Sequence, residues 1–527
     1  MQTAALHEWL QQELQRAQPA GRALQPGALI LQLVRRAVLE GVLIPGVRVP
    51  SSRELARELG VARNTIVAIY DQLKSEGMLV AGHGSGTFVC RVQDALVAQT
   101  RGLADVAGAG SSNEPADAPA VTGSQAVRPL SLSRRGLSYQ RHPVHQFWRP
   151  QAFCSGQLDL KLFPLATWNR LQRKHLSEGG AACLEQGEPG GDMALRRAIA
   201  DHIRTMRGVR CQPEQVILTD GTVESLELVT RLLADPGDVA LMENPCYWGA
   251  SHVLGDHGLQ TCSLDVDPEG LPVPQPGQLP GPPRLVYVTP SHQFPMGHVM
   301  TLARRLAWLR YAEAHDAILL EDDYDSEFRY TGKPFPSLQG MQDTGRVIYL
   351  GTFSKTLYPG IRMAYLVVPP HLQHVFATAS SDFYRDGDVV QQRVLADFIR
   401  EGHYAAHVRA TRREYGLRRE ALLSALREHL GPELADGRIT MSGGAMGMHL
   451  TLLLPPGVDD RGISRATACL GVTLMPLSVY CVGNPSSGLI LSYAAVPCDQ
   501  MSPKIALVAP LIRQALMGQC AALPADS

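Results

Sequence analysis

The sequence predicts an α/β protein in which a small N-terminal helical domain precedes a large domain built on a mainly parallel sheet. Three observations support this fold class. Residues 1–90 show helical periodicity and then a short hairpin pattern. Residues 104–126 are rich in Ala, Gly, Ser and Pro, which is typical of a flexible linker. From residue 146 onward, β-rich apolar runs alternate with amphipathic helices. We therefore expect one domain over 20–90, a linker over 91–145 and a large domain over 146–520.

Composition excludes several classes of protein. The chain has 527 residues, and its 49 Lys and Arg against 50 Asp and Glu give a formal net charge of −1. Any nucleic-acid surface must therefore be a local patch. No apolar run approaches the length of a membrane span, and the first ten residues do not resemble a signal peptide. The 10 cysteines form no CxxC pair, which indicates reduced thiols and a cytoplasmic protein without a zinc site.

The first ninety residues contain three helix patterns in close succession. Residues 29–41 place apolar side chains on one helix face. Ser51 and Glu54 have the spacing of a capping box for a short helix that ends at Gly60. A third helix starts near Ala62 and buries Ile66 and Ile69. Two short helices joined by a tight glycine turn predict a helix-turn-helix.

The residues that open these two helices suit contact with DNA. Arg63, Asn64 and Thr65 begin the second helix, whose N-terminal side chains reach base edges in the major groove. The preceding helix begins at Ser51, Ser52 and Arg53, where backbone N–H groups favour a phosphate. Two short apolar strands around a glycine-rich tip then predict a hairpin wing over 78–90. The alternative is a small packed helical domain that does not contact DNA.

The string PGVRVPSSRELARELGVARNTIVAIYDQLKSEGMLVAGHGSGTFV resembles the GntR-type winged helix-turn-helix along its whole length. This resemblance implies that Arg48, Arg53 and Arg63 are the DNA-contacting arginines. It also implies that the wing, at His83 and Gly84, approaches the minor groove.

In the large domain, buried strands precede the residues with chemical potential. Lys355 follows the apolar run 346–350 in a segment of small and hydroxyl side chains, and a partly desolvated lysine can form a Schiff base with an aldehyde. Asp322 follows another such run, where ligands bind in open α/β sheets. Gly221 and Thr222 lie between a strand and a helix and can cup a phosphate. An aldehyde-reactive lysine, a carboxylate and a phosphate cup together suit pyridoxal phosphate (PLP).

Residues 150–520 resemble the fold-type I aminotransferases, in stretches that include GEPGGDMALRRAIADHIRTMRGV and GTFSKTLYPGIR. The resemblance implies that Lys355 is the Schiff-base lysine, that Asp322 pairs with the pyridine nitrogen and that Tyr324 bonds the phenolic oxygen of PLP. Tyr247 would stack on the ring.

The same resemblance implies a phosphate site and a second subdomain. Gly221, Thr222, Ser354 and Arg362 would hold the phosphate of PLP. A smaller C-terminal α+β subdomain would follow the main sheet.

A GntR-type head joined to an aminotransferase-like body resembles the MocR/GabR family of PLP-dependent transcription regulators. The string TPSHQFP at 289–295 and the run from Glu321 to Tyr330 are similar to that family in particular. Membership implies binding of operator DNA and of a small amine or amino-acid-like effector. It also implies a head-to-tail homodimer.

Several positions depart from active aminotransferases. Ile490 occupies the place of the arginine that clamps the substrate carboxylate. Phe294 replaces an Asn, Gln186 a Tyr that reaches the partner subunit, and Cys246 a Gly. Glu224 lies near the phosphate cup and is expected to point away from it.

These departures spare the residues that hold the cofactor. They predict a PLP-binding regulator without efficient transaminase turnover, in which an amine effector displaces Lys355. Two alternatives stay open: a working aminotransferase with a DNA-binding head, and a plain GntR-type repressor whose large domain only dimerises. No metal site is predicted, since His403 and His407 lack a third ligand.

Overall fold

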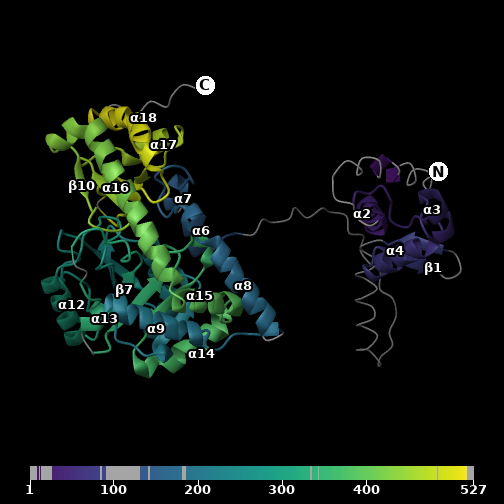
Figure 1. The fold of residues 1–527 in the computed structure, drawn as a ribbon, viewed down its shortest axis with the longest axis horizontal. Coiled ribbons are helices and arrows are strands. Elements are labelled where there is room, and N and C mark those ends of the chain that lie inside the picture. Colours follow the sequence, from purple (N-terminus) through teal and green to yellow (C-terminus); the bar gives the residue numbers. More distant parts are fainter. Residues whose placement is uncertain are drawn as a thin grey trace, which may run out of the picture. The chain divides into compact units, whose positions relative to one another are not determined.

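The computed structural model describes residues 9–10, 12–13, 26–82, 86–90, 131–140, 143–180, 185–332, 335–341, 344–483 and 485–518. The chain divides into two compact units, Met1–Arg128 and Pro129–Ser527. Figure 1 shows the helices and strands of both units. None of the described helices is both long and apolar enough to cross a membrane.

The first unit has the helix-turn-helix and wing that the sequence predicts. Its helices are α2 (Pro26–Leu39), α3 (Ser52–Leu59) and α4 (Arg63–Ser75), and its hairpin is β1 (Leu79–Gly82) with β2 (Gly86–Val89). Ser51 and Glu54 form the expected capping box, and Gly60 ends α3 with a φ of 66°. Ile66 and Ile69 are buried between the helices.

A seven-stranded sheet forms the centre of the second unit. Its strand order is β3-β9-β8-β7-β6-β4-β5. Pairing is parallel from β8 through to β5, whereas β9 runs antiparallel to both of its neighbours, so the sheet is mainly parallel as predicted. The strands span Val216–Thr219 (β3), Val239–Asn244 (β4), Gln260–Asp265 (β5), Leu285–Val288 (β6), Ile318–Asp323 (β7), Val347–Thr352 (β8) and Ala364–Val367 (β9).

Helices cover both faces of this sheet and make a three-layer α/β/α structure. One face packs against α8 (Leu165–Gly179), α9 (Met193–Arg207), α12 (Leu302–Ala314) and α15 (Val389–Arg400). The other face packs against α10 (Thr222–Leu233), α11 (Trp248–Asp256) and α14 (Gln373–Tyr384). The two faces separate because successive strand residues point to opposite sides.

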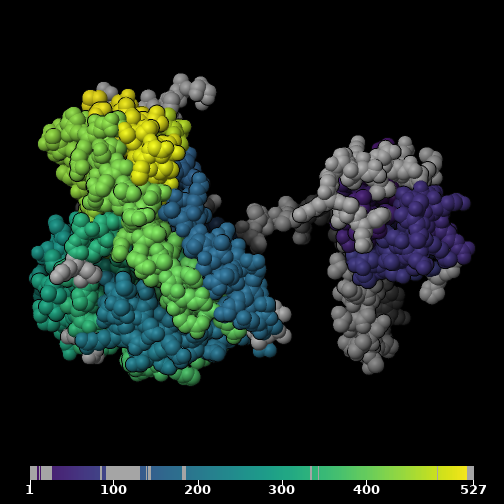
Figure 2. Space-filling view, in the orientation of Figure 1, coloured from purple at the N-terminus to yellow at the C-terminus, as the bar shows by residue number. Residues whose placement is uncertain are grey.

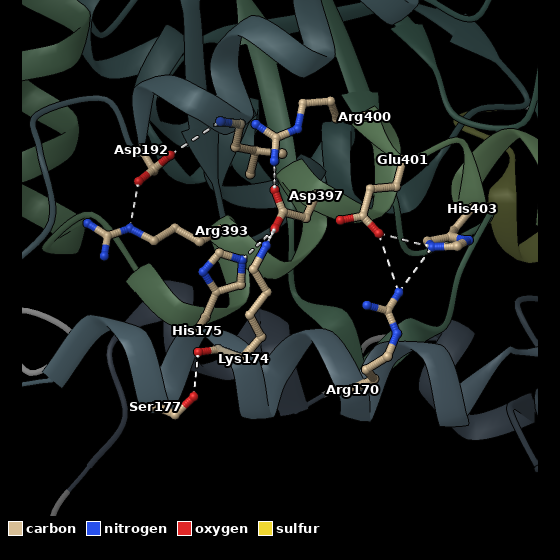
Figure 3. A network of polar contacts seen from close by, with 11 residues as sticks. Arg170, Lys174, His175, Ser177, Asp192, Arg393, Asp397, Arg400, Glu401 and His403 are labelled. Carbon is tan, nitrogen blue, oxygen red and sulfur yellow. Dashed lines mark hydrogen bonds and ion pairs between the residues drawn. The ribbon is translucent and has the colours of Figure 1, made fainter.

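A polar network fixes α8 against the helices beside it (Figure 3). The carboxylate of Asp397 on α15 accepts hydrogen bonds of 3.0 Å from both Lys174 and His175 on α8. Arg170 lies 3.3 Å from the carboxylate of Glu401, at the end of α15. The carboxylate of Asp397 is 7% exposed, so these ion pairs are better shielded from solvent than ordinary surface pairs.

The C-terminal part forms a smaller α+β subdomain, as the aminotransferase resemblance implies. Its antiparallel sheet has the order β10-β11-β13-β12. The long helix α16 (His403–Ala435) runs from the main sheet to this subdomain across the surface shown in Figure 2. The other elements are β10 (Thr440–Ser442), β11 (His449–Leu453), α17 (Asp460–Ala468), β12 (Met475–Pro476), β13 (Gly488–Ser492) and α18 (Cys498–Leu516).

Two short helices begin inside the range 91–145 that the sequence assigns to the linker. They are α6 (Arg134–Gln140) and α7 (Pro143–Phe147). The hydroxyl of Tyr139 donates a 2.7 Å hydrogen bond to Asp256 on α11, and Phe147 is buried against the C-terminal subdomain. The second unit thus begins before residue 146, because these aromatic side chains find partners on it. The remaining short helices are α13 (Leu338–Met341) and 3₁₀ turns at 160–162, 213–215, 359–361, 370–372 and 477–480.

Candidate functional site

The sequence-predicted cofactor residues follow strands whose carboxyl ends meet at one edge of the main sheet. Strand β7 ends in Asp322 and Asp323, and β8 leads into Lys355. Strand β4 leads towards Tyr247, and β3 leads into the start of α10. All four strands run in the same direction. Such an edge is where open α/β sheets bind ligands.

Asp322 and Asp323 have opposite roles because they point to opposite faces of β7. Asp323 is held from the α9 side, where Arg207 lies 2.6 Å from its Oδ2. Tyr349 donates a second hydrogen bond of 2.6 Å to the same oxygen. Asp322 is free of this network, so it is the carboxylate available to a ligand.

The Asp322 carboxylate is buried and only half satisfied. Its Oδ2 accepts a 2.6 Å hydrogen bond from Tyr287, whereas its Oδ1 is buried without a hydrogen-bond partner among the described residues. Burial raises the pKa of Asp322 to about 7. An unpartnered buried acceptor requires a donor, and the protonated pyridine nitrogen of PLP is a donor of the right kind. This residue therefore fits the cofactor.

The amine of Lys355 lies close to the backbone of Gly156. A Cβ added to Gly156, whose φ is +82°, would be 3.3 Å from the Lys355 Nζ. Burial lowers the pKa of Lys355, while the carboxylates of Asp325 and Asp322 oppose this shift. A lowered pKa increases the neutral, nucleophilic fraction of the amine. The loop is fixed next to the lysine, because Nε2 of His407 lies 3.0 Å from the carbonyl oxygen of Thr356.

Aromatic rings cluster around this position. The Tyr247 ring lies against the backbone of Gly249, where an added Cβ would be 2.5 Å from its Cε1. Phe294 meets the rings of Tyr247 and Tyr324 edge to face, at centroid distances of 6.5 and 6.1 Å. Phe294, which stands in place of an Asn, therefore offers packing where an amide would offer a hydrogen bond.

Two of the four phosphate-binding candidates, Gly221 and Thr222, lie at the start of α10. Gly221 is the N-cap of this helix and Thr222 its first residue, so their N–H groups are available to an anion. Arg362 lines a cavity of about 220 Å³ together with Asp220 and Glu224. The backbone N–H of Ser354 donates to the hydroxyl of Thr352 at 3.2 Å.

The expected orientation of Glu224 is wrong. Its carboxylate points towards the phosphate cup and accepts a 3.1 Å hydrogen bond from the backbone N–H of Asp220. The reason is that the start of a helix leaves backbone donors unpaired, and a glutamate one turn later can satisfy one of them. Burial raises the pKa of Glu224 to about 7, which makes a neutral carboxyl accessible near neutral pH.

The positions that depart from active aminotransferases are also explained by their surroundings. Ile490 is fully buried in a cluster with Val144, Phe147 and Tyr480. Cys246 is buried, and burial raises the pKa of its thiol to about 12, so it is an unreactive structural cysteine. Gln186 is exposed.

The sequence missed a buried group beside Tyr324. Ligand atoms of His292, Asp325 and His449 all lie within 4.8 Å of one another. Hydrogen bonds account for their positions: Nδ1 of His292 contacts Asp325 and Tyr324, and Nε2 of His449 contacts the carbonyl oxygen of Pro295 at 3.0 Å. His292 lies in TPSHQFP and Asp325 in EDDYDSEF, but their separation in sequence gives no signal of contact.

In the N-terminal unit, the predicted DNA-contacting arginines, Arg48, Arg53 and Arg63, are exposed cations without an ion pair among the described residues. Arg57 shares this property. By contrast, Arg35 pairs with Glu76 and Lys74 pairs with Asp71. Exposed cations without partners are suited to phosphate and base contacts.

The other predicted DNA-contacting residues differ in solvent exposure and in their hydrogen bonds. Asn64 is exposed at the start of α4, and Ser52 and Thr65 are half-buried. The Ser51 side chain caps α3 through the N–H of Glu54. His83 and Gly84 lie outside the described residues.

Comparisons with known proteins define the class. Residues 28–89 match the model of the family described as bacterial regulatory proteins, gntR family. The chain is 36% identical over 470 residues to the probable rhizopine catabolism regulatory protein MocR of Rhizobium meliloti, covering 89% of this chain and 90% of that one. It is 33% identical over 455 residues to the HTH-type transcriptional regulator TauR of Rhodobacter capsulatus, covering 85% and 88%.

The second unit also resembles solved aminotransferases. It matches the Pyrococcus horikoshii kynurenine aminotransferase, in a structure with PMP, at a TM-score of 0.65 and 25% identity, over 73% of this chain and 97% of that one. The molecule is thus a GntR-type winged-helix regulator carrying a fold-type I aminotransferase-like domain. It belongs to the MocR/GabR family of transcription regulators.

Proposed function

We propose that this regulator binds PLP through Lys355 and binds operator DNA through its winged helix. An amine-type effector changes DNA binding by reacting at the PLP site. The observation that carries the proposal is the Asp322 carboxylate, whose buried Oδ1 lacks a hydrogen-bond partner among the described residues, at the same sheet edge as Lys355. An aminotransferase-like fold implies PLP as the cofactor. PLP supplies an aldehyde that bonds amines and a ring that withdraws electrons.

Each side chain of the site has a part in holding the cofactor. Lys355 would bond the aldehyde carbon of bound PLP, and Asp322 would accept a hydrogen bond from the pyridine nitrogen and keep it protonated. Tyr247 would cover one face of the ring, and Tyr324 would donate to the phenolic oxygen. The N–H groups of Gly221 and Thr222, with Ser354 and the Arg362 guanidinium, would bind the phosphate.

The same site is poorly suited to turnover of α-amino acids. An aminotransferase needs a cation that pairs with the substrate carboxylate, and Ile490 is a buried apolar residue at the position where that arginine is expected. An effector amine can still displace Lys355 without further reaction. Such a ligand shifts the protein between two arrangements only through its different affinity for each.

On the DNA side, the proposal assigns separate roles to the opening residues of two helices. Arg63, Asn64 and Thr65 read base edges in the major groove, while Arg48, Ser51, Ser52 and Arg53 contact phosphates. His83 and Gly84 of the wing approach the minor groove. We place this activity in the cytoplasm, in a head-to-tail homodimer.

The experiment follows operator binding directly. DNA that the protein selects from a random pool is labelled, and its fluorescence anisotropy is titrated with protein in the presence of PLP and a panel of amines. We expect at least one amine to change the apparent Kd in the wild type but not in Lys355→Ala. Equal responses from both proteins would overturn the proposal.

A further inference from the structure

The hydroxyl of Tyr324 already has a hydrogen-bond partner inside the protein. It lies 2.9 Å from Nδ1 of His292. The same Nδ1 lies 2.9 and 3.1 Å from the two carboxylate oxygens of Asp325. His292 and Asp325 are each 1% exposed. Two groups, with three oxygen atoms between them, thus converge on one nitrogen that carries at most one proton.

The chemistry of these groups fixes where that proton lies. An ionised carboxylate only accepts hydrogen bonds, so an ionised Asp325 requires a proton on Nδ1 of His292. Burial raises the pKa of Asp325, whereas His292 opposes this shift and favours the ionised form. A protonated Nδ1 cannot accept, so the contact with Tyr324 is one in which the tyrosine oxygen accepts. The hydroxyl hydrogen of Tyr324 is then left for another acceptor. Among the described residues, no second partner of this hydroxyl takes it up.

The imidazole of His292 has no room to change its orientation. A Cβ on Gly447, whose φ is +80°, would be 2.0 Å from Cε1 of His292 and 2.5 Å from its Nδ1. On the other side, a Cβ on Gly297 would be 3.2 Å from its Nε2. The ring of His449 lies at a centroid distance of 5.0 Å. Backbone and rings therefore clamp the imidazole from several directions.

We propose that His292 is a positioning residue: its Nδ1 proton, shared between Asp325 and Tyr324, leaves the Tyr324 hydroxyl hydrogen free for the phenolic oxygen of bound PLP. This inference rests on the proposed function. It extends that function by assigning two residues, His292 and Asp325, to the orientation of a third. A metal ion held by His292, Asp325 and His449 is the competing use of the same side chains.

The first test uses the wild-type protein without cofactor. Protein labelled with ¹⁵N-histidine is compared by NMR with His292→Phe, so that the signals lost in the variant identify His292. We expect Nδ1 of His292 to be protonated, and we expect added Zn²⁺ to leave these signals unchanged. An unprotonated Nδ1, or a shift on adding stoichiometric Zn²⁺, would overturn the proposal.

The second test asks whether His292 acts through Tyr324. PLP affinity and the pH midpoint of the visible band of bound PLP are measured for His292→Phe, Tyr324→Phe and the double variant. We expect Tyr324→Phe to weaken PLP binding about tenfold, because one hydrogen bond to a charged acceptor is lost. His292→Phe should weaken it by up to the same factor, because the Tyr324 hydroxyl is no longer oriented, and both variants should move the midpoint in the same direction. The double variant should change neither quantity beyond Tyr324→Phe alone.

A control variant and the possible outcomes distinguish a failure of the role of His292 from a failure of the proposed function. His298→Phe removes a histidine of the same segment and should leave the midpoint unchanged. Additive effects in the double variant, or an unshifted midpoint in His292→Phe, would contradict the role of His292 alone. A wild-type protein that develops no visible band with PLP would instead overturn the proposed function.

Discussion

Tyr287 donates a 2.6 Å hydrogen bond to Oδ2 of Asp322, and the other carboxylate oxygen is buried without a partner among the described residues. Both side chains are nearly inaccessible to solvent. The hydrogen bond from Tyr287 orients the carboxylate and leaves its second oxygen free to accept another hydrogen bond. Oδ1 of Asp323 is also buried without a partner, but Arg207 neutralises that carboxylate on the opposite face of β7. Asp322 has no such cation, so it is the oriented carboxylate left for a ligand.

This arrangement predicts a pH-dependent stability of the cofactor-free protein. The pKa of Asp322 is raised by burial from 3.8 to about 7, so between these values the folded state holds a proton that the unfolded chain has lost. The contribution of Asp322 to stability is therefore lost as the pH rises through this window. Asp322→Asn removes that loss, so its stability relative to wild type should increase by up to about 1.4 kcal/mol per pH unit.

Urea unfolding of both proteins at pH 5 and pH 8 measures this difference. Asp382→Asn, which changes an exposed carboxylate, serves as the control and should show no such trend. If the difference in the free energy of unfolding between Asp322→Asn and wild type stays constant across the pH range, Asp322 is ionised in the folded protein throughout.

Glu224 predicts a pH dependence of cofactor binding. Its pKa is raised to about 7 by burial, and its carboxylate points towards the cup that receives the phosphate. Above pH 7 it is charged and repels the phosphate, so PLP affinity should fall between pH 6 and pH 8. Glu224→Gln should bind PLP more tightly than wild type at pH 8 and about equally at pH 6. Parallel pH profiles for the two proteins would refute this role.

Arg63 and Arg53 should affect DNA binding in different ways. Arg63→Ala should cost about 1–3 kcal/mol of operator binding and reduce discrimination between sequences, because it removes a base contact. Arg53→Ala should weaken binding to all DNA sequences alike and reduce the salt dependence of the binding constant, because it removes a phosphate contact. Lys74→Ala removes one positive charge from the far end of α4 and is the matched control. Identical profiles for all three variants would mean that only net charge matters.

Ile490 tests whether a carboxylate clamp can be restored. Ile490→Arg places a guanidinium inside an apolar cluster, so we expect a loss of about 3–5 kcal/mol in the free energy of unfolding, or failure to fold. Ile490→Val should cost only about 0.5–1.5 kcal/mol. An arginine variant that is as stable as wild type and gains affinity for amino acids would contradict the buried environment of this residue.

Much of the fold was predictable because it depends on local patterns. The capping box at Ser51 and Glu54 and the turn at Gly60 are short-range signals, and the structure has both. The apolar runs that precede Asp322 and Lys355 form β7 and β8 of the main sheet, since buried strands need continuous apolar sequence. The order of the strands in the sheet is set by packing of distant segments and was not predicted.

Two of the missed features depend on contacts between residues far apart in the sequence, and the third on a local contact at the start of a helix. Asp325 and His292 are 33 positions apart and meet only because β6 and β7 are neighbours. The helices at 134–147 begin in the range assigned to the linker, and they are held by partners such as Asp256. Glu224 points inward because it satisfies a backbone donor, an effect that composition does not reveal.

The most direct measurement identifies the lysine that carries the cofactor. The purified protein is incubated with PLP, reduced with borohydride and digested, and the modified peptide is mapped by mass spectrometry. Lys355→Ala, checked for folding by circular dichroism, is treated in parallel. We expect the label on Lys355 alone and none in the variant. Stoichiometric label on another lysine, or no label in the wild type, would contradict a PLP-dependent regulator built around Lys355.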